Sequence, residues 1–241
     1  MKDYETYAQK YPAVVAMLVP ALLTTAILSS YLPDIQGVWN TFIAKIGTFI
    51  PVVLIYGAIG YFARQLFRDA SKKIFQYSLF DEDETDMPTT QLLLRTSDKR
   101  LSINSIDSIA EKVYRDFSIK LFNKKEENDD IIEAKRTIVD AVGKIREATR
   151  NNPNLHNYNI DFGFCRNYLG ATVYAVAIIL FILIINLLFG ISDWKLILIA
   201  LAFQLVLGLL VFMSLKQRGF AYARALFNAY LSEKEYTWDE K

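Results

Sequence analysis

The stretch that decides the fold is YLGATVYAVAIILFILIINLLFGIS, which runs from Tyr168 to Ser192 and contains no charged side chain. Three further stretches share this property: Tyr11–Pro33, Ile46–Ala63 and Leu196–Leu215. A helix needs about 20 apolar residues to cross roughly 30 Å of hydrocarbon, and about 17 to 25 residues suffice. The sequence therefore predicts a mainly all-α integral membrane protein with four transmembrane helices.

The composition of the 241-residue chain agrees with a membrane protein whose charged residues lie mainly outside the spans. Hydrophobic residues make up 53% of the chain, more than soluble domains usually contain. The charges gather in Phe67–Arg166, which holds 17 of the 27 Lys and Arg and 18 of the 26 Asp and Glu. A net charge of +1 excludes a strongly cationic nucleic-acid binder. A single cysteine, Cys165, and a single histidine, His156, exclude a disulfide framework and a Cys/His metal cluster.

The predicted organisation has four parts. They are an N-terminal tail and hairpin over 1–66, with spans at 11–33 and 46–66; a cytoplasmic insert over 67–166; a second hairpin over 167–215, with spans at 168–191 and 194–215; and a C-terminal helix and tail over 216–241. A signal peptide is the alternative for the first span. Its apolar run exceeds the roughly 7 to 15 residues of a cleavable signal, which favours a retained span.

Lys and Arg are concentrated on one side of these spans. They follow span two, precede span three and follow span four: Arg64, Arg68, Lys72, Lys73, Lys144, Arg146, Arg150, Arg166, Lys216, Arg218 and Arg224. The opposite connections carry only Lys45 and Lys195. Because positive charge favours the cytoplasmic side, both termini and the insert are predicted to be cytoplasmic, in the inner (plasma) membrane. Trp39 and Trp194 would then lie near the outer headgroups.

Arg64, Arg68 and Lys72 recur every four residues, so they share one face of a helix as span two leaves the bilayer. Contact with inner-leaflet lipid phosphates is one interpretation, and a purely topological role is the other. Two long helices are expected to continue out of the membrane, Ile46–Phe75 and Leu196–Leu231, because their apolar spacing persists past the spans.

The charge-free stretch within each span leaves no charged side chain in the membrane interior, which favours helix packing over an ion pathway. Thr24, Thr25 and Gln204 lie at similar predicted depth. A hydrogen bond between one of these threonines and Gln204 is therefore feasible and would join two spans.

Two amphipathic helices are predicted in the insert. Apolar residues step by three or four from Ile103 to Leu121, with Ser102 as N-cap, and again from Asp129 to Arg150, with Asn128 or Asp129 as N-cap. A charged turn, Asn123–Asp130, is expected between them. The acidic run Asp81–Asp86 is interpreted as a loop, and Gln91–Arg95 as a strand or an extended segment.

The segment Asn159–Asn167, NIDFGFCRN, precedes span three directly. Gly163 permits close backbone approach, Asp161 and Arg166 carry opposite charges, and Asn167 is a suitable N-cap residue. We therefore expect a structural joint here, with an Asp161–Arg166 pair and with Asn167 capping span three.

Two motifs are similar to those of a family of uncharacterised prokaryotic four-span membrane proteins. The first is Pro88-Thr89-Thr90 followed by leucines, and the second is Asn159-Ile160-Asp161-Phe162-Gly163-Phe164 with Arg166, Asn167 and Gly170. Where a second glycine is expected, the chain has Ala171, which argues against a tight helix crossing. The architecture is also similar to membrane effectors of bacterial antiviral operons, an analogy of layout alone.

No motif in the sequence indicates an enzyme, a cofactor or a metal site. We interpret the protein as a membrane-perturbing effector that acts as a homo-oligomer among membrane lipids. Its cytosolic insert would sense a nucleotide or a partner protein. Arg95, Lys99, Arg100 and Arg166 are the expected phosphate contacts, because guanidinium and ammonium groups pair with phosphate. The alternative is a scaffold that recruits a cytosolic partner to the membrane.

Overall fold

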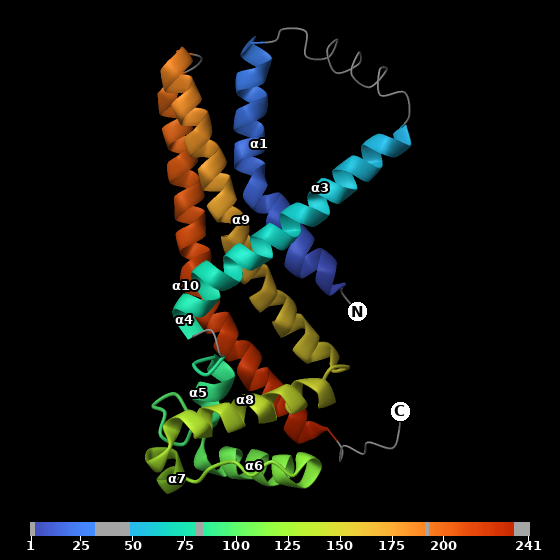
Figure 1. Ribbon diagram of the computed structural model, residues 1–241, viewed down its shortest axis with the longest axis vertical. Helices are drawn as coiled ribbons and strands as arrows, with labels where there is room; N and C mark the ends of the chain where they lie inside the picture. The colour runs from blue at the N-terminus through green and yellow to red at the C-terminus, as the bar shows by residue number, and fades with distance from the viewer. Residues whose placement is uncertain (1–2, 32–48, 81–83, 191–192, 234–241) are drawn as a thin grey trace. The chain divides into compact units, whose positions relative to one another are not determined.

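The computed structural model describes residues 3–31, 49–80, 84–190 and 193–233 (Figure 1). Within these ranges every regular element is helical, as the apolar periodicity predicts. The order is η1 (Thr6–Lys10, π-helical), α1 (Tyr11–Tyr31), α3 (Phe49–Ala70), η2 (Ser71–Gln76, π-helical), α4 (Tyr77–Phe80), α5 (Pro88–Leu93), α6 (Ile103–Phe117), α7 (Lys124–Asp129), α8 (Ile131–Ala148), α9 (Pro153–Phe189) and α10 (Trp194–Ser232).

The chain divides into two compact units. The insert unit comprises Met1–Tyr4, Gln76–Gly163 and Ser214–Lys241, and the apolar unit comprises Glu5–Phe75 and Phe164–Met213. Both α9 and α10 contribute residues to each unit. The extension of α10 past the apolar stretch confirms the predicted continuous helix Leu196–Leu231.

Three described helices are long and apolar enough to cross a membrane: Thr6–Ile27, Pro153–Phe189 and Trp194–Ser232. Their apolar side chains are widely exposed, with Leu22, Phe181 and Ile199 each more than 60% exposed. Exposed apolar surface of this extent is typical of membrane contact. The chain is thus an all-α protein with the features of a membrane protein. The first residues of the second predicted span, 46–48, lie outside the described residues, and that span stays a prediction.

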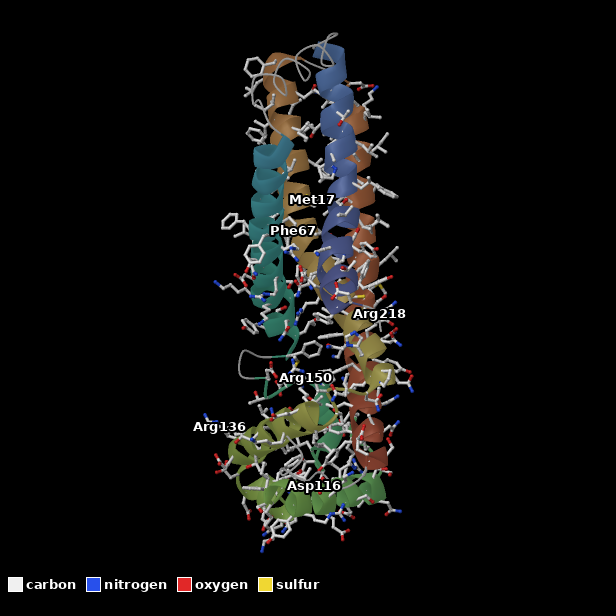
Figure 2. The ribbon with its side chains drawn as sticks, turned by 90° about the vertical axis from the view of Figure 1, so that its right-hand side faces the viewer. Met17, Phe67, Asp116, Arg136, Arg150 and Arg218 are labelled. Atoms are coloured by element: carbon white, nitrogen blue, oxygen red, sulfur yellow. The ribbon has the colours of Figure 1, made fainter. Side chains whose placement is uncertain are left out.

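The apolar unit has small cores where its helices meet. Ala16 of α1, Phe67 of α3 and Tyr168 with Ala171 of α9 form one of them, and Met17 packs at its edge (Figure 2). Leu23, Ile179 and Ile197 form the other. Each core contains few buried residues because most of the apolar surface faces outward.

The insert unit has a larger core, as expected of a unit that folds in water. α5, α6, α8 and α10 supply most of its buried side chains: Leu92, Leu93, Ile109, Val113, Ile138, Ala141, Val142, Ile145, Ala223, Leu226, Phe227, Ala229 and Tyr230. The apolar faces predicted for the two amphipathic helices therefore pack on the end of α10.

The predicted N-cap of the first amphipathic helix is confirmed, since Ser102 Oγ accepts a hydrogen bond from Ser105 N at 3.2 Å. The helix ends earlier than predicted, at Phe117, because Ser118 adopts a left-handed conformation (φ +58°). The cap of the second is Asp130 rather than Asn128 or Asp129, and its carboxylate accepts from Glu133 N at 3.0 Å.

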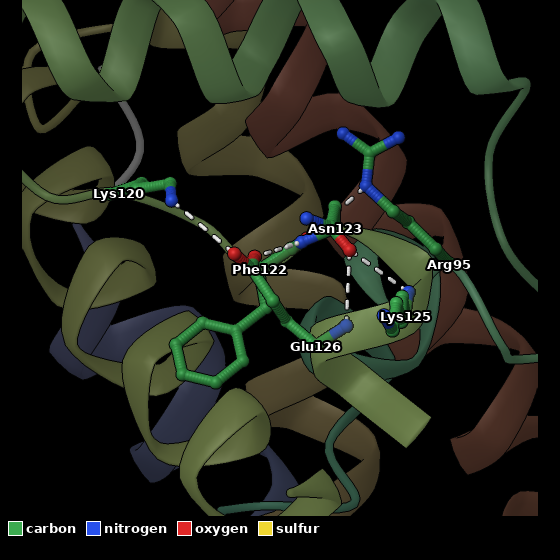
Figure 3. Close-up of polar contacts among 6 residues, drawn as sticks. All are labelled: Arg95, Lys120, Phe122, Asn123, Lys125 and Glu126. Carbon is green, nitrogen blue, oxygen red and sulfur yellow. Dashed lines mark hydrogen bonds and ion pairs between the residues drawn. The ribbon is translucent and has the colours of Figure 1, made fainter. Parts of the chain in front are cut away.

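The charged turn predicted for Asn123–Asp130 is wrong, because this segment contains helix α7. Asn123 Oδ1 accepts from the backbone of Lys125 and Glu126, and Glu126 Oε2 accepts from Asn123 N at 2.8 Å (Figure 3). This reciprocal capping box satisfies backbone N–H groups that a short helix leaves open. The hydrogen bond from the Asn123 backbone lowers the pKa of Glu126.

The extended segment predicted for Gln91–Arg95 is also wrong, since Pro88–Leu93 forms helix α5. Pro88 occupies the first turn, where its missing N–H costs nothing. Gln91 Nε2 donates to Asp86 O at 2.7 Å, which fixes the preceding loop. Of the acidic run, 81–83 lie outside the described residues; Glu84 and Asp86 pair with Arg146 and Lys135 of α8 at 3.1 and 2.6 Å.

The structure corrects two details of the segment Asn159–Asn167, although the boundary between the two units falls within it, between Gly163 and Phe164. This segment lies inside α9, so Asn167 caps no helix. Five residues of continuous helix put Asp161 and Arg166 on different sides of α9, about 140° apart at 100° per residue. The structure instead pairs Asp161 with Arg218 of α10 at 3.3 Å.

Candidate functional site

Arg95, a predicted phosphate contact, is held by the protein itself. Its Nη2 pairs with Asp107 at 2.7 Å, and its Nε donates to Phe122 O at 3.2 Å (Figure 3). Only 16% of the side chain is exposed. The guanidinium therefore ties α5 to α6 and to the start of α7, which leaves it poorly placed to receive a ligand.

The backbone beside Arg95 is held by Glu127, which sequence reasoning missed. Glu127 is 1% exposed, and its two carboxylate oxygens accept from Arg95 N and Thr96 N, each at 3.0 Å. Burying a carboxylate is tolerated when donors satisfy both oxygens. In the sequence Glu127 belongs to a charged run, and no local signal distinguishes it from a solvated residue.

The loop between α5 and α6 presents Lys99 to α10. The ammonium of Lys99 lies 5.3 Å from the centroid of the Phe220 ring. Lys216 precedes Phe220 by one helical turn and lies beside Lys99. Interaction with the neighbouring Lys216, whose positive charge disfavours a second cation beside it, lowers the pKa of Lys99. Two cations from distant parts of the sequence thus meet on one exposed face of α10.

The two other predicted phosphate contacts, Arg100 and Arg166, have different surroundings from this pair. Arg100 is exposed, and its Nη1 donates to Ser97 O at 3.2 Å within its own loop. Arg166 is half-buried in the apolar unit, in α9 beside the buried Cys165. The four predicted residues are therefore divided between the two units, with Arg95, Lys99 and Arg100 in the insert unit and Arg166 in the apolar unit.

The Pro-Thr-Thr motif is buried against α10. Thr89 and Thr90 are 4% and 1% exposed, and Thr90 Oγ1 donates to Glu84 O at 3.2 Å. A Cβ added at Gly219 of α10 would lie 3.1 Å from Pro88 Cγ and 3.4 Å from Phe162 Cε2. Residues of both motifs thus pack around Gly219, and their role in the insert unit is structural. Asn159 and Gly163 lie in the same part of α9, half-buried and buried respectively.

A buried lysine binds the carbonyl groups at the C-terminal end of α10. Lys112 is 7% exposed, and its ammonium donates to Tyr230 O and Glu233 O, each at 2.6 Å. Carbonyls at a helix C-terminus have no intrahelical partner, so they can accept hydrogen bonds from a buried cation and replace its lost water. Tyr230 also donates its hydroxyl to Asp116 at 2.9 Å. Burial first, and then this carboxylate, raise the pKa of Tyr230.

In the apolar unit, Asn167 links three segments. Its Nδ2 donates to Ala8 O at 2.5 Å, and its Oδ1 lies 3.5 Å from Ser71 Oγ. Ser71 is fully buried, and its one hydroxyl proton is shared between Arg68 O, at 2.6 Å, and the more distant Asn167 Oδ1. One amide thus connects η1, η2 and α9, which is a larger role than the predicted helix cap.

Close to Asn167, α3 and α9 cross tightly at Gly170. A Cβ there would overlap the Phe67 carbonyl oxygen and lie 2.8 Å from Ser71 Cβ. The inference from Ala171 that no tight crossing occurs is therefore wrong. A single glycine is enough, because Ala171 packs with Ala16, Phe67 and Tyr168 while only Gly170 faces the backbone of α3.

The predicted lipid-facing stripe is only partly available for lipid. Arg64 pairs with Glu5, which also pairs with Lys10 at 3.3 Å. The hydrogen bond from Arg64, reinforced by Lys10, lowers the pKa of Glu5. Arg68 is 3.9 Å from Asp69, and Lys72 lies half-buried in η2. Arg64 is therefore charge-compensated within the protein, and contact of the stripe with lipid stays a prediction.

The hydrogen bond predicted between Gln204 and Thr24 or Thr25 is wrong. Thr24 and Thr25 donate to the carbonyls four residues before them, Pro20 O and Ala21 O. Gln204 Nε2 instead reaches Thr172 Oγ1 of α9 at 3.5 Å. Gln204 Oε1 is buried and has no hydrogen-bond partner in the described part of the chain. The hydroxyl of each threonine donates its one proton to a carbonyl of its own helix. It therefore has no proton left to donate to the amide oxygen of Gln204.

Among the described residues, no group of three or more His, Cys, Asp or Glu side chains is arranged to hold a metal ion. Comparison with protein-family models, with curated proteins and with solved structures finds no match to this chain. The resemblance over Met87–Gly170 therefore stays a prediction. What the residues support is two buried polar centres, Lys112 and Asn167, and one exposed cation pair, Lys99 with Lys216.

Proposed function

We propose that the protein is a membrane-perturbing effector, in which a cytosolic helical unit controls the packing of four membrane spans. The observation that carries the proposal is the continuity of α10. This one helix bears exposed apolar residues such as Leu209 and Met213, and further along it supplies Ala223, Leu226 and Phe227 to the insert-unit core. A change in the insert unit therefore acts on a helix that also belongs to the membrane part.

A continuous helix transmits displacement better than a flexible linker does, provided that it has two discrete arrangements. α9 also contributes to both units, and α3 continues through η2 into α4 without a loop. The cation distribution of the sequence supports an inner-membrane location with both termini and the insert in the cytoplasm. A four-span monomer is too narrow to enclose a wide pore, so the active form is a homo-oligomer.

The signal is a cytosolic nucleotide or partner protein, and the context is antiviral defence by analogy of layout. The test is inducible expression in bacteria with a membrane-potential dye. Depolarisation on induction, alone or together with the products of adjacent genes, supports the effector. Unchanged potential in both cases, at a confirmed level of membrane-inserted protein, contradicts it.

Transmission through α3 is tested by replacing Asp69 and Ala70 with glycine. The two substitutions loosen the helix at a cost of roughly 1 kcal/mol each relative to alanine. Asp69→Ala is the matched control, because it removes the same carboxylate and keeps the helix propensity. The effector proposal expects normal insertion and lost depolarisation in the double glycine variant alone.

A membrane scaffold is the second candidate function, and the uncharged spans favour it. Spans that conduct ions or protons usually carry ionisable residues. A scaffold would leave the membrane potential unchanged and would retain a cytosolic partner at the membrane. Loss of that partner from membrane fractions after deletion of the gene would identify it.

A further inference from the structure

Lys99 and Lys216 form an exposed cation pair, and nothing in the described structure neutralises it. Neighbouring cations are paired with carboxylates: Arg95 with Asp107, Arg218 with Asp161. Within the described residues, no ion pair joins Lys99 or Lys216 to an acidic side chain. Two ammonium groups held side by side repel each other, and an anion bound between them would remove that repulsion.

The protein holds Lys99 in this position by a firmly built loop. Glu127 anchors the backbone at Arg95 and Thr96, Ser97 N donates to Leu94 O at 3.1 Å, and Leu101 N donates to Leu92 O at 2.9 Å. Lys216 is fixed by α10. Neither backbone needs to reorganise for the two ammonium groups to act together, which reduces the entropic cost of binding.

The position of the pair along α10 indicates the kind of anion. Lys216 follows Leu215 directly, and Leu215 ends the charge-free stretch that begins at Leu196. A residue at that boundary lies at the level of the lipid headgroups, where each cation gains roughly 1 kcal/mol from an anionic surface. Phe220, one turn further, contributes its ring face to Lys99.

We propose that Lys99 and Lys216 bind the phosphate of an anionic phospholipid headgroup at the cytoplasmic surface. The phosphate oxygens accept hydrogen bonds from both ammonium groups, one from the α5–α6 loop and one from α10. The lipid therefore joins the insert unit to the membrane surface at a specific point. This lipid source rests on the membrane location in the proposed function, but it does not rest on the effector activity.

The experiment is native mass spectrometry of the purified full-length protein in detergent. Phosphatidylglycerol is added at rising concentration, and phosphatidylcholine with the same acyl chains is the zwitterionic comparison. Wild type is expected to retain phosphatidylglycerol preferentially. Lys99→Gln and Lys216→Gln are each expected to weaken its binding about fivefold, the factor that corresponds to about 1 kcal/mol. Both residues are exposed, so both variants are expected to fold.

Lys125→Gln is the matched control, because Lys125 is an exposed lysine of α7 away from the pair and the charge change is the same. Lys216→Glu is a second test that does not depend on the stability of the glutamine variants. It supplies a carboxylate beside Lys99, so phosphatidylglycerol binding is expected to be lost while the thermal midpoint rises.

Equal lipid binding by wild type and the glutamine variants would overturn the proposal. So would an equal loss in Lys125→Gln, which would indicate only a general charge effect. Inorganic phosphate that displaces phosphatidylglycerol at low millimolar concentration would overturn the lipid source in favour of a soluble phosphate. Because lipid binding is measured without a membrane potential, its outcome is independent of whether the protein depolarises cells.

Discussion

Polar side chains are buried in both units of the molecule, but their chemistry differs between the two. The insert unit buries charged residues, Lys112 and Glu127. In the described part of the apolar unit the buried polar residues are neutral: Ser71, Asn167, Thr172, Asn186 and Gln204. These two buried charged residues each contact backbone groups that lie at or beyond helix ends.

The difference follows from what surrounds each group. Helix ends and loops leave carbonyls and N–H groups open, and these groups solvate a buried charge in place of water. Long apolar helices use their backbone groups internally, so a charge between them finds no such partners. A neutral amide needs only one or two hydrogen bonds, and small residues nearby let the helices approach closely.

The largest effect is expected from Gly170→Ala in the apolar unit. The added Cβ would overlap the Phe67 carbonyl oxygen, so α3 and α9 must separate. We expect a loss of about 3 kcal/mol or more in stability, measured by denaturant unfolding in detergent. Gly60→Ala in α3 is the control, because nothing lies within 4 Å of its Cβ position. Equal stability of both variants would show that the crossing can relax.

Lys112→Met breaks the charged centre of the insert unit. Tyr230 O and Glu233 O lose their donor, which we expect to cost about 2 kcal/mol. Hydrogen–deuterium exchange should increase at the end of α10 and leave the apolar unit unchanged. Lys120→Met, which removes a lysine whose side chain is 74% exposed, should change stability by less than about 0.5 kcal/mol. Similar exchange in the two variants would exclude a structural role for the buried ammonium.

Asn167→Ala tests the neutral centre of the apolar unit. The substitution removes the hydrogen bonds to Ala8 O and Ser71 Oγ, and bonds of this kind between membrane helices contribute about 0.6 to 2 kcal/mol. We expect a loss of about 1 kcal/mol in detergent unfolding. The exposed Asn157→Ala in the same helix should be near neutral. A loss above that of Lys112→Met would reverse the comparison between the two units.

The smallest effect is expected for Gln204→Leu. Its amide makes one long hydrogen bond, at 3.5 Å, and buries a carbonyl oxygen that lacks a partner in the described chain. Loss of the bond and removal of the unsatisfied oxygen oppose each other, so stability should change by less than about 0.6 kcal/mol. A loss above about 2 kcal/mol, in the same unfolding assay, would show that Gln204 binds a group beyond Thr172.

Sequence reasoning succeeded where the signal is local. The cap at Ser102 and the apolar faces of α6 and α8 depend on residues within one or two turns. It failed at α7, because the charges of Lys124–Asp129 suggested a solvated turn although Asn123 and Glu126 have the spacing of a capping box. It missed the continuous helix through Asn159–Asn167 and the pairing of Asp161 with Arg218, because both depend on packing against segments far away in the sequence.

By itself the sequence determined the helical class and the long apolar helices, because membrane thickness sets a length that a charge-free run either meets or does not. The contacts that join distant segments of the chain were decided by the tertiary structure alone. Lys112 and Tyr230 are 118 residues apart, Asn167 and Ala8 are 159 apart, and neither pair leaves a pattern in the sequence. The same holds for Lys99 and Lys216. Each is an ordinary surface lysine in the sequence, and they become a pair only because Glu127 holds the α5–α6 loop and Phe220 lies beneath it.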